Sequence, residues 1–182
     1  MRTFLFCAVL FGLLATSVRA ETFDEWKDRK LGEVSAIWRS DHYDLYVPFY
    51  AWHNRLAYDD AHIAKYNEKA FGFGFGKSLH DEKGDWYGIY AFGFKDSNSK
   101  FETVAGYAYQ KNWSLLCNSD FKVGVGYTLG MTQRHEYLYI PVPMILPIFG
   151  VEYKNLALQG GYVPGLHNFG NVILFWMRYQ FY

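Results

Sequence analysis

The sequence predicts an all-β fold, an eight-stranded antiparallel transmembrane β-barrel that follows an N-terminal amphipathic helix. Three observations predict it. Aromatic residues make up 21% of the 182 residues and 17 more are glycine, a composition that favours a membrane boundary. No stretch reaches the roughly 20 apolar residues that a spanning helix needs. After Asp41, apolar and polar residues alternate in segments of about ten, the length of a tilted membrane-spanning strand.

Residues 1–20 are predicted to be a secretory signal peptide. Arg2 precedes an apolar run from Phe4 to Ala15, and Val18-Arg19-Ala20 ends the segment in the pattern that signal peptidase cleaves. The apolar run is too short to cross a bilayer. We therefore expect the cleaved chain to reside in the bacterial outer membrane.

Residues 21–40 are predicted to form the amphipathic helix. Acidic and basic residues separate its apolar positions, which fall at near-helical spacing. We expect this helix to lie on the periplasmic side, where it would cover one end of the barrel; binding a specific partner is the alternative. The apolar positions are Phe23, Trp26, Leu31, Val34, Ile37 and Trp38.

Residues 41–182 are predicted to form the barrel. Strand eight alternates most cleanly, and an even number of strands lets the sheet close without leaving unpaired backbone in hydrocarbon. The predicted strands are 43–53, 69–79, 85–95, 101–111, 120–130, 138–149, 154–163 and 171–181.

Glycines alternate with large residues in strand two. Phe71, Phe73 and Phe75 are expected to face lipid, which leaves the glycines between them facing the lumen. This pattern predicts an apolar and partly empty interior that could hold a lipid chain. Relief of strain in a small, strongly curved barrel is the alternative explanation.

Prolines interrupt several predicted strands. Because proline removes a hydrogen bond of the strand ladder, seams between strands are expected there. Such a seam is either slack in the wall or a lateral door for lipid. The prolines are Pro48, Pro141, Pro143 and Pro147 within strands and Pro164 at a strand end.

A histidine, a carboxylate and a hydroxyl are expected to meet at the outer rim. Strands one and three both run outward, so His53 at the end of one should lie near Asp96 and Ser97 at the end of the other. Histidine accepts protons near neutral pH, and serine can be a nucleophile or an oxyanion donor. This grouping could therefore catalyse acyl transfer.

Charge and histidine spacing exclude other classes of function. The 18 basic and 18 acidic residues balance, so no nucleic-acid partner is expected. The six histidines lack the short paired spacing of metal ligands, so we predict no metal and no cofactor. Basic residues near the outer loops are either solvated or in contact with anionic lipid headgroups. They are Arg55, Lys65, Lys69, Lys95, Lys100 and Arg134.

Short motifs in collinear order across nearly all of the cleaved chain resemble the outer-membrane lipid A palmitoyltransferases, the PagP family. Together they are far more specific than any one motif. They are His42-Tyr43-Asp44-Leu45-Tyr46-Val47-Pro48, Trp52-His53, Arg55, Ala57-Tyr58, Tyr66-Asn67-Glu68, Asp81-Glu82-Lys83-Gly84, Phe94-Lys95-Asp96-Ser97, Ala105-Gly106-Tyr107, Tyr139-Ile140-Pro141 and residues 171–178.

The resemblance implies transfer of palmitate from a glycerophospholipid to lipid A, with an apolar interior that measures the acyl chain. It implies that His53, Asp96 and Ser97 are catalytic. The prolines that flank the family's lateral openings match Pro48, Pro147 and Pro164. A lipid hydrolase, or a non-enzymatic barrel for adhesion or membrane integrity, is the alternative, and the choice between monomer and homodimer is open.

The chain departs from the family pattern at a few positions. Ala108 stands where a glycine is expected at the floor of the hydrocarbon ruler, so its extra methyl group should either shorten the preferred acyl chain or be offset by neighbouring residues. Ala70 replaces a proline beside one opening. His167 and His62 fall at outer-loop positions tied to phospholipid gating and lipopolysaccharide recognition. The residues expected to recognise lipopolysaccharide are His62, Arg55 and Arg134.

Overall fold

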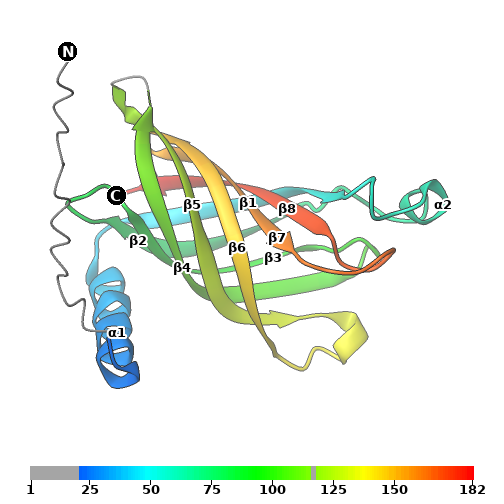
Figure 1. Cartoon of the computed structure of the whole chain (residues 1–182), viewed down its shortest axis with the longest axis horizontal. Coiled ribbons are helices and arrows are strands. Elements are labelled where there is room, and N and C mark those ends of the chain that lie inside the picture. The colour runs from blue at the N-terminus through cyan, green and yellow to red at the C-terminus, as the bar shows by residue number, and fades with distance from the viewer. Residues whose placement is uncertain (1–20, 116–117) are drawn as a thin grey trace, which may run out of the picture.

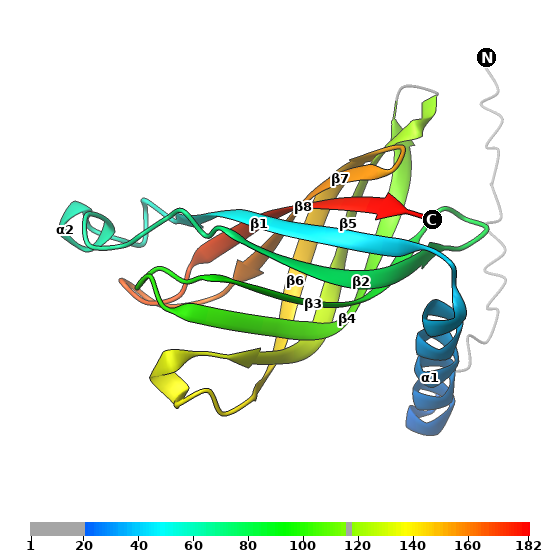
Figure 2. The ribbon, with the colours of Figure 1, turned by 180° about the vertical axis from the view of Figure 1, so that it is seen from behind.

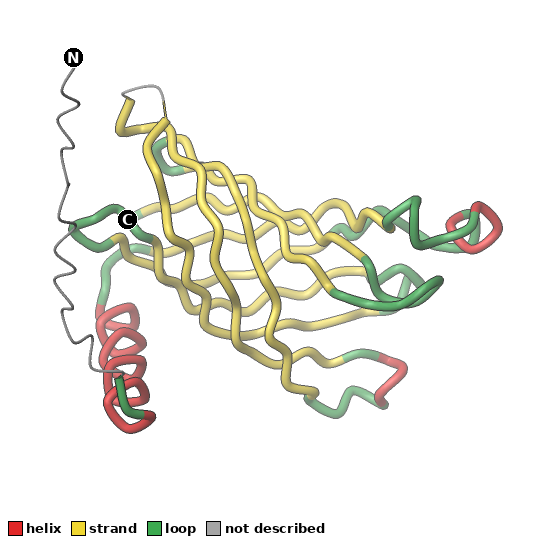
Figure 3. The backbone as a smooth tube through the Cα atoms, in the orientation of Figure 1, coloured by secondary structure: helices red, strands yellow, loops and turns green. Residues whose placement is uncertain are grey.

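A computed structural model describes residues 21–115 and 118–182, so the predicted signal peptide lies outside the described residues. No helix within these two ranges is both long and apolar enough to cross a membrane. One long helix precedes eight strands, and two short helical turns lie in loops (Figures 1 and 3). The elements are α1 (Phe23–Arg39), β1 (Tyr43–His53), α2 (Asp60–Ile63), β2 (Gly72–His80), β3 (Trp86–Lys95), β4 (Phe101–Leu115), β5 (Asn118–Gln133), a 3-10 helix (His135–Tyr137), β6 (Val142–Tyr153), β7 (Leu156–Val163) and β8 (Val172–Phe181).

The eight strands close into a barrel. Each strand pairs antiparallel with the next, and β1 pairs with β8 from Tyr43↔Phe181 to His53↔Val172. The predicted fold class is therefore confirmed. The β1 bounds match the prediction, whereas β4 and β5 extend further into a hairpin that projects beyond its neighbours on the α1 side of the barrel (Figure 1).

The predicted start of strand six was wrong. Residues 138–141 belong to a loop, and β6 begins at Val142. Leu138 and Tyr139 have φ angles of 53° and 60°, a left-handed conformation that no strand can contain. Pro141 follows them and has no N–H to donate to a ladder.

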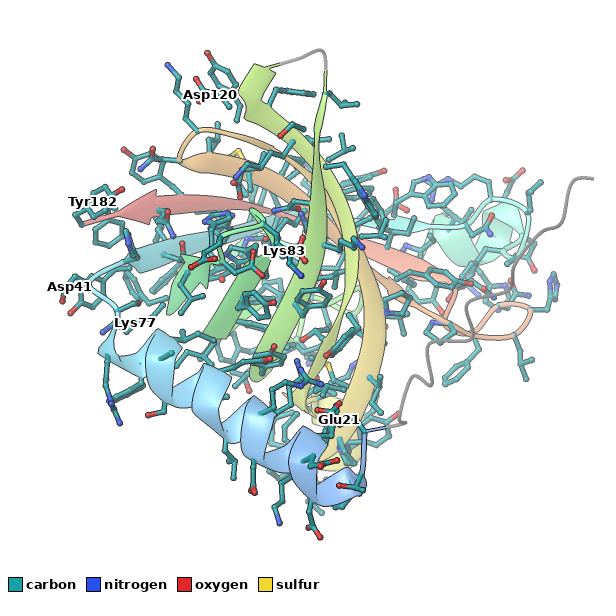
Figure 4. The ribbon with its side chains drawn as sticks, turned by 60° about the vertical axis from the view of Figure 1, so that its left-hand side comes forward. Glu21, Asp41, Lys77, Lys83, Asp120 and Tyr182 are labelled. Atoms are coloured by element: carbon teal, nitrogen blue, oxygen red, sulfur yellow. The ribbon has the colours of Figure 1, made fainter. Side chains whose placement is uncertain are left out.

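Helix α1 begins with a capping box in which the side chains and backbones of Thr22 and Glu25 bond reciprocally. The helix lies across one end of the barrel (Figure 4). Lys30 fixes it there: its Nζ donates to Tyr107 Oη at 3.0 Å and to Glu33 at 2.7 Å, and Tyr107 donates to Glu33 at 2.6 Å. The charged side chain of Lys30 thus joins α1 to β4 in the wall of the barrel.

The outer wall carries the large apolar residues. Phe71, Phe73 and Phe75 are 62%, 67% and 59% exposed, as the alternation in the sequence predicts for side chains that face lipid. On β8, Met177 and Tyr179 are also exposed, while Trp176, Arg178 and Gln180, which alternate with them, are buried in the lumen.

The lumen is apolar only in the half away from α1. Aromatic and aliphatic side chains pack together there, so the prediction of an apolar interior holds for this half. The glycines beside them leave room for these side chains: a Cβ at Gly74 would lie 2.3 Å from Cβ of Phe92. The packed residues include Ala51, Ala70, Phe92, Phe94, Val104 and Trp176.

In the half nearer α1 the lumen is polar, which corrects the expectation of an apolar interior throughout. Arg178 is 1% exposed and binds Asp44 Oδ1 at 3.1 Å and the carboxylate of Glu152. A chain of amides continues across the lumen through hydrogen bonds between Trp176, Gln159, Gln110 and Asn112. Buried charges in a membrane barrel need partners, and here they have them.

Two ladders of the wall stop at prolines, as the sequence predicts. Pairing between β1 and β2 ends at Tyr46↔Gly74, just before Pro48. Pairing between β6 and β7 begins at Ile148↔Gly161, just after Pro147. Both seams therefore lie in the half of the barrel away from α1.

Arg178→Met is expected to lower the free energy of unfolding by about 3–5 kcal/mol, because Asp44 would stay buried without its cation and Glu152 would keep only His80 and Lys122. Denaturant unfolding in detergent micelles, followed by tryptophan fluorescence, measures the change. Lys83→Met in the exposed β2–β3 turn is the control and should change stability by less than about 0.5 kcal/mol. Equal effects of the two substitutions would contradict a stabilising role for the buried network.

Candidate active site

The candidate site lies at the rim opposite α1, where β1 and β3 both end (Figure 2). β1 ends at His53, and the β3–β4 turn begins at Asp96. This shared direction brings His53 and Ser97 together, as the sequence analysis expects. His53 Nε2 lies 3.0 Å from Ser97 Oγ.

The second nitrogen of His53 faces a carboxylate that the sequence analysis missed. His53 Nδ1 lies 3.1 Å from Oε1 of Glu68, a residue of the loop between β1 and β2. Hydrogen bonds from Arg55 hold the pKa of Glu68 well below its usual range, so the carboxylate is ionised and can only accept. With the proton on Nδ1, facing this carboxylate, Nε2 would be free to accept one from a hydroxyl.

The side chain of Asp96, which the resemblance implies is catalytic, bonds to its own turn rather than to His53. Its Oδ1 accepts from the backbone N–H groups of Asn98 and Lys100 at 2.9 and 2.8 Å, which closes the β3–β4 turn. Its Oδ2 lies 3.8 Å from Arg134 Nη2. Asp96 thus shapes the turn that presents Ser97.

Two tyrosines hold the imidazole ring of His53. Tyr66 stacks on it with ring centroids 4.8 Å apart and an interplanar angle of 11°, and Tyr58 packs edge-on at 5.1 Å. Only 1% of His53 is exposed. The ring is therefore fixed in orientation and shielded from water, which strengthens its hydrogen bonds.

Glu68 and Tyr66 left a weak signal in the sequence. Both belong to the motif Tyr66-Asn67-Glu68 in a loop, and strand periodicity does not place loop side chains. The carbonyl of Ser97 accepts from Asn67 N at 2.8 Å, so this motif is tied directly to the β3–β4 turn. A carboxylate just before β2, across from the end of β1, was the available clue.

The three basic residues expected to recognise lipopolysaccharide all have acidic partners. An anionic headgroup would have to share or displace these partners. Hydrogen bonds from His62 lower the pKa of Asp59 to about 2, so that carboxylate is charged at neutral pH. The pairs are Arg55 with Glu68 at 2.7 Å, His62 with Asp59 at 2.7 Å and Arg134 with Glu102 at 3.3 Å.

Ala108 belongs to β4 and is buried at the boundary between the apolar and polar halves of the lumen. It is 2% exposed and its cross-strand neighbours are Gly88 and Thr128. The next lumen residue towards α1 is the buried Gln110, which belongs to the amide chain. The expected ruler floor therefore coincides with a change from apolar to polar side chains.

The residues expected at the lateral openings are spread along the wall and the rim. Pro48 is buried, whereas Pro147, Pro164 and His167 are exposed. Pro164 and His167 lie in the loop between β7 and β8, apart from the two interrupted ladders. Within residues 21–115 and 118–182, no group of three or more potential ligands is placed to hold a metal ion.

Comparison with known proteins adds to this geometry. The family model described as "Antimicrobial peptide resistance and lipid A acylation protein PagP" matches residues 33–178. Lipid A acyltransferase PagP of Shigella boydii and lipid A palmitoyltransferase PagP of Escherichia coli are each 42% identical over 178 residues, which cover 97% of this chain and 96% of each relative.

Neisserial surface protein A, a solved structure, aligns with 14% identity and a TM-score of 0.42, covering 78% of this chain and 98% of that one. The fold assignment rests on the closed strand ladder described above. The family match spans β1 to β8 and includes His53, Asp96 and Ser97. The chain belongs to the PagP family of outer-membrane lipid A acylation proteins.

Proposed function

We propose that this protein transfers a palmitoyl or similar long acyl chain from a glycerophospholipid to a hydroxyl of lipid A in the outer leaflet of the outer membrane. The contact of 3.0 Å between His53 Nε2 and Ser97 Oγ carries the proposal. It combines a proton acceptor and a hydroxyl at the mouth of a barrel whose adjoining half is apolar. The names of two relatives, a lipid A acyltransferase and a lipid A palmitoyltransferase, agree with it.

His53 acts as the general base. A hydroxyl loses its proton to Nε2 as its oxygen attacks the carbonyl carbon of the donor ester. The tetrahedral intermediate then expels the glycerol oxygen, which takes the proton back from the imidazolium. Either the hydroxyl is that of lipid A and Ser97 donates to the oxyanion, or Ser97 itself attacks and forms an acyl intermediate that lipid A resolves.

The apolar half of the lumen receives the acyl chain. The chain enters sideways where the β1–β2 and β6–β7 ladders are interrupted at Pro48 and Pro147, with Pro164 and His167 at the neighbouring rim. It stops at the level of Ala108, because the amides and charges beyond would lose their partners to a hydrocarbon tail. At the rim, the phosphates of lipid A bind to the basic side chains of Arg55, His62 and Arg134. Signal-peptide cleavage before Glu21 precedes assembly.

His53→Phe and Ser97→Ala test the chemistry. Cells that express the wild type should contain lipid A with one added acyl chain. His53→Phe should lower the transfer rate by about 10²–10⁴-fold, since the general base is lost. Mass spectrometry of lipid A measures the product, and the intact mass of the protein reveals an acyl-Ser97 intermediate.

Lipid A without an added chain in wild-type cells would refute the transferase. Release of free fatty acid without an acceptor would instead favour the hydrolase. Lipid composition that does not respond to His53→Phe would favour a non-enzymatic barrel.

Ala108→Gly is expected to shift donor selection towards a longer acyl chain, because it removes a methyl group at the end of the apolar half. Profiling the transferred chains from a mixture of donor lengths measures the shift. Ala157→Gly, which also removes a methyl group from a buried lumen position but in the polar half, is the control. An unchanged profile for Ala108→Gly would place the floor elsewhere.

Asp96→Asn should retain most transfer, while Asp96→Ala should lose it. The amide oxygen of asparagine can still accept from the N–H groups of Asn98 and Lys100 and hold the turn that presents Ser97. Transfer rates of the two folded variants give the comparison. If both substitutions abolish transfer equally, the charge of Asp96 rather than its role in the turn is required.

A further inference from the structure

Glu68 joins the candidate base to the wall of the barrel. Its Oε1 lies 3.1 Å from His53 Nδ1 and accepts from the His53 backbone N–H at 3.1 Å. Its Oε2 accepts from Tyr50 Oη at 2.8 Å and from Arg55 Nη2 at 2.7 Å. Its carbonyl accepts from Ala51 N at 2.9 Å. Every one of these donors belongs to β1 or to the residues just after it.

These contacts lie at the interrupted ladder. The regular pairing between β1 and β2 ends at Tyr46, and the next backbone contact across this seam is the bond from Ala51 to Glu68. Glu68 therefore closes the rim end of the seam. The same carboxylate contacts the seam through Tyr50 and the base through His53.

We propose that Glu68 is the positioning residue of His53: its carboxylate holds the imidazole with the proton on Nδ1 and Nε2 turned to Ser97. This inference rests on the proposed function, because it assigns the partner of the base in that reaction. Glu68 touches no reacting atom. It acts by fixing the tautomer, and its negative charge favours the imidazolium that forms when His53 takes a proton.

Asp96, the carboxylate expected in this role, is occupied elsewhere. Its Oδ1 accepts from two backbone N–H groups of its own turn, and its other oxygen faces Arg134. Tyr66 and Tyr58 contact the faces and edge of the imidazole but not its nitrogens. Glu68 is the only carboxylate that the described residues bring to Nδ1.

Arg55 makes this arrangement rigid. Its guanidinium binds both oxygens of Glu68 and also donates to the His53 carbonyl. Such a two-point contact fixes the plane of the carboxylate. A glutamine at position 68 could not reproduce it, because an amide has one accepting oxygen while donors face both sides of the carboxylate.

Glu68→Gln is expected to lower kcat for acyl transfer by roughly 100-fold or more, since the base loses its orientation, and to leave KM for the phospholipid within about twofold, since the backbone bond from Ala51 that closes the seam is kept. Purified full-length variants in detergent micelles, with a defined phospholipid and lipid A, give both constants. Glu82→Gln, an exposed residue in the β2–β3 turn, is the matched control and should behave as wild type. Glu68→Asp keeps the charge and should recover part of kcat.

Nitrogen-15 NMR of the imidazole reads the tautomer directly and separates positioning from folding. Wild-type His53 should carry its proton on Nδ1, while Glu68→Gln should show a mixture of tautomers in a protein that still migrates as a folded barrel in unheated gels. Tyr50→Phe removes the seam contact but leaves the Nδ1 contact, so its tautomer should be that of wild type.

Two results would overturn the inference: a Glu68→Gln variant with wild-type kcat, or one with His53 still wholly in the Nδ1–H tautomer. Failure of the proposed function is distinguishable, because then the wild type itself transfers no acyl chain. The tautomer would still report in that case whether Glu68 holds His53.

Discussion

Backbone hydrogen bonding in hydrocarbon governs this structure. No water is present in a bilayer core to satisfy peptide groups, so eight strands must pair all the way around, and β1 must meet β8. Proline cannot donate to such a ladder, yet Pro48 and Pro147 stand where two ladders stop. Both interruptions lie in the half of the barrel that is apolar inside. In the proposed reaction, these interruptions are the places where lipid would pass between the bilayer and the lumen.

The division of the lumen follows from the same constraint. A narrow barrel must fill its interior, and side chains that point inward cannot reach water. In one half, Arg178 satisfies this requirement by pairing with Asp44 and Glu152, and amides bond to one another. In the other half, aromatic side chains pack beside glycines. An acyl chain is compatible only with the second half, so in the proposed reaction the polarity of the lumen side chains would limit chain length together with the shape of the lumen.

Much of the fold could be predicted because strand periodicity is a local property. Alternation placed β1 within the correct residues and assigned Phe71, Phe73 and Phe75 to the lipid face. The start of β6 could not be predicted in this way, since the left-handed residues Leu138 and Tyr139 have no signature in hydrophobicity. The polar half of the lumen could have been predicted from the sequence. Arg178 and Trp176 share the lumen face of β8, and a charge on that face requires a partner.

Only part of the candidate site could be predicted from the sequence. His53 and Ser97 end strands of the same direction, so topology alone brings them to one rim, and the structure puts their side chains 3.0 Å apart. Asp96 ends the same strand, but its carboxylate accepts hydrogen bonds from the backbone N–H groups of its own turn and does not reach the imidazole. The partner of Nδ1 came instead from a loop.

The position of the loop between β1 and β2 explains why it supplies the partner of His53 Nδ1. Glu68 lies where the β1–β2 ladder has ended. Its carboxylate can accept hydrogen bonds from β1, which lacks backbone partners in β2 there, as well as from the imidazole of His53. The interrupted ladder leaves this part of β1 without backbone partners in β2, and Glu68 ties β1 to the neighbouring loop instead. One residue therefore contacts both the imidazole of His53 and the rim end of the seam, so the orientation of the candidate base is tied to the place where the β1–β2 ladder stops.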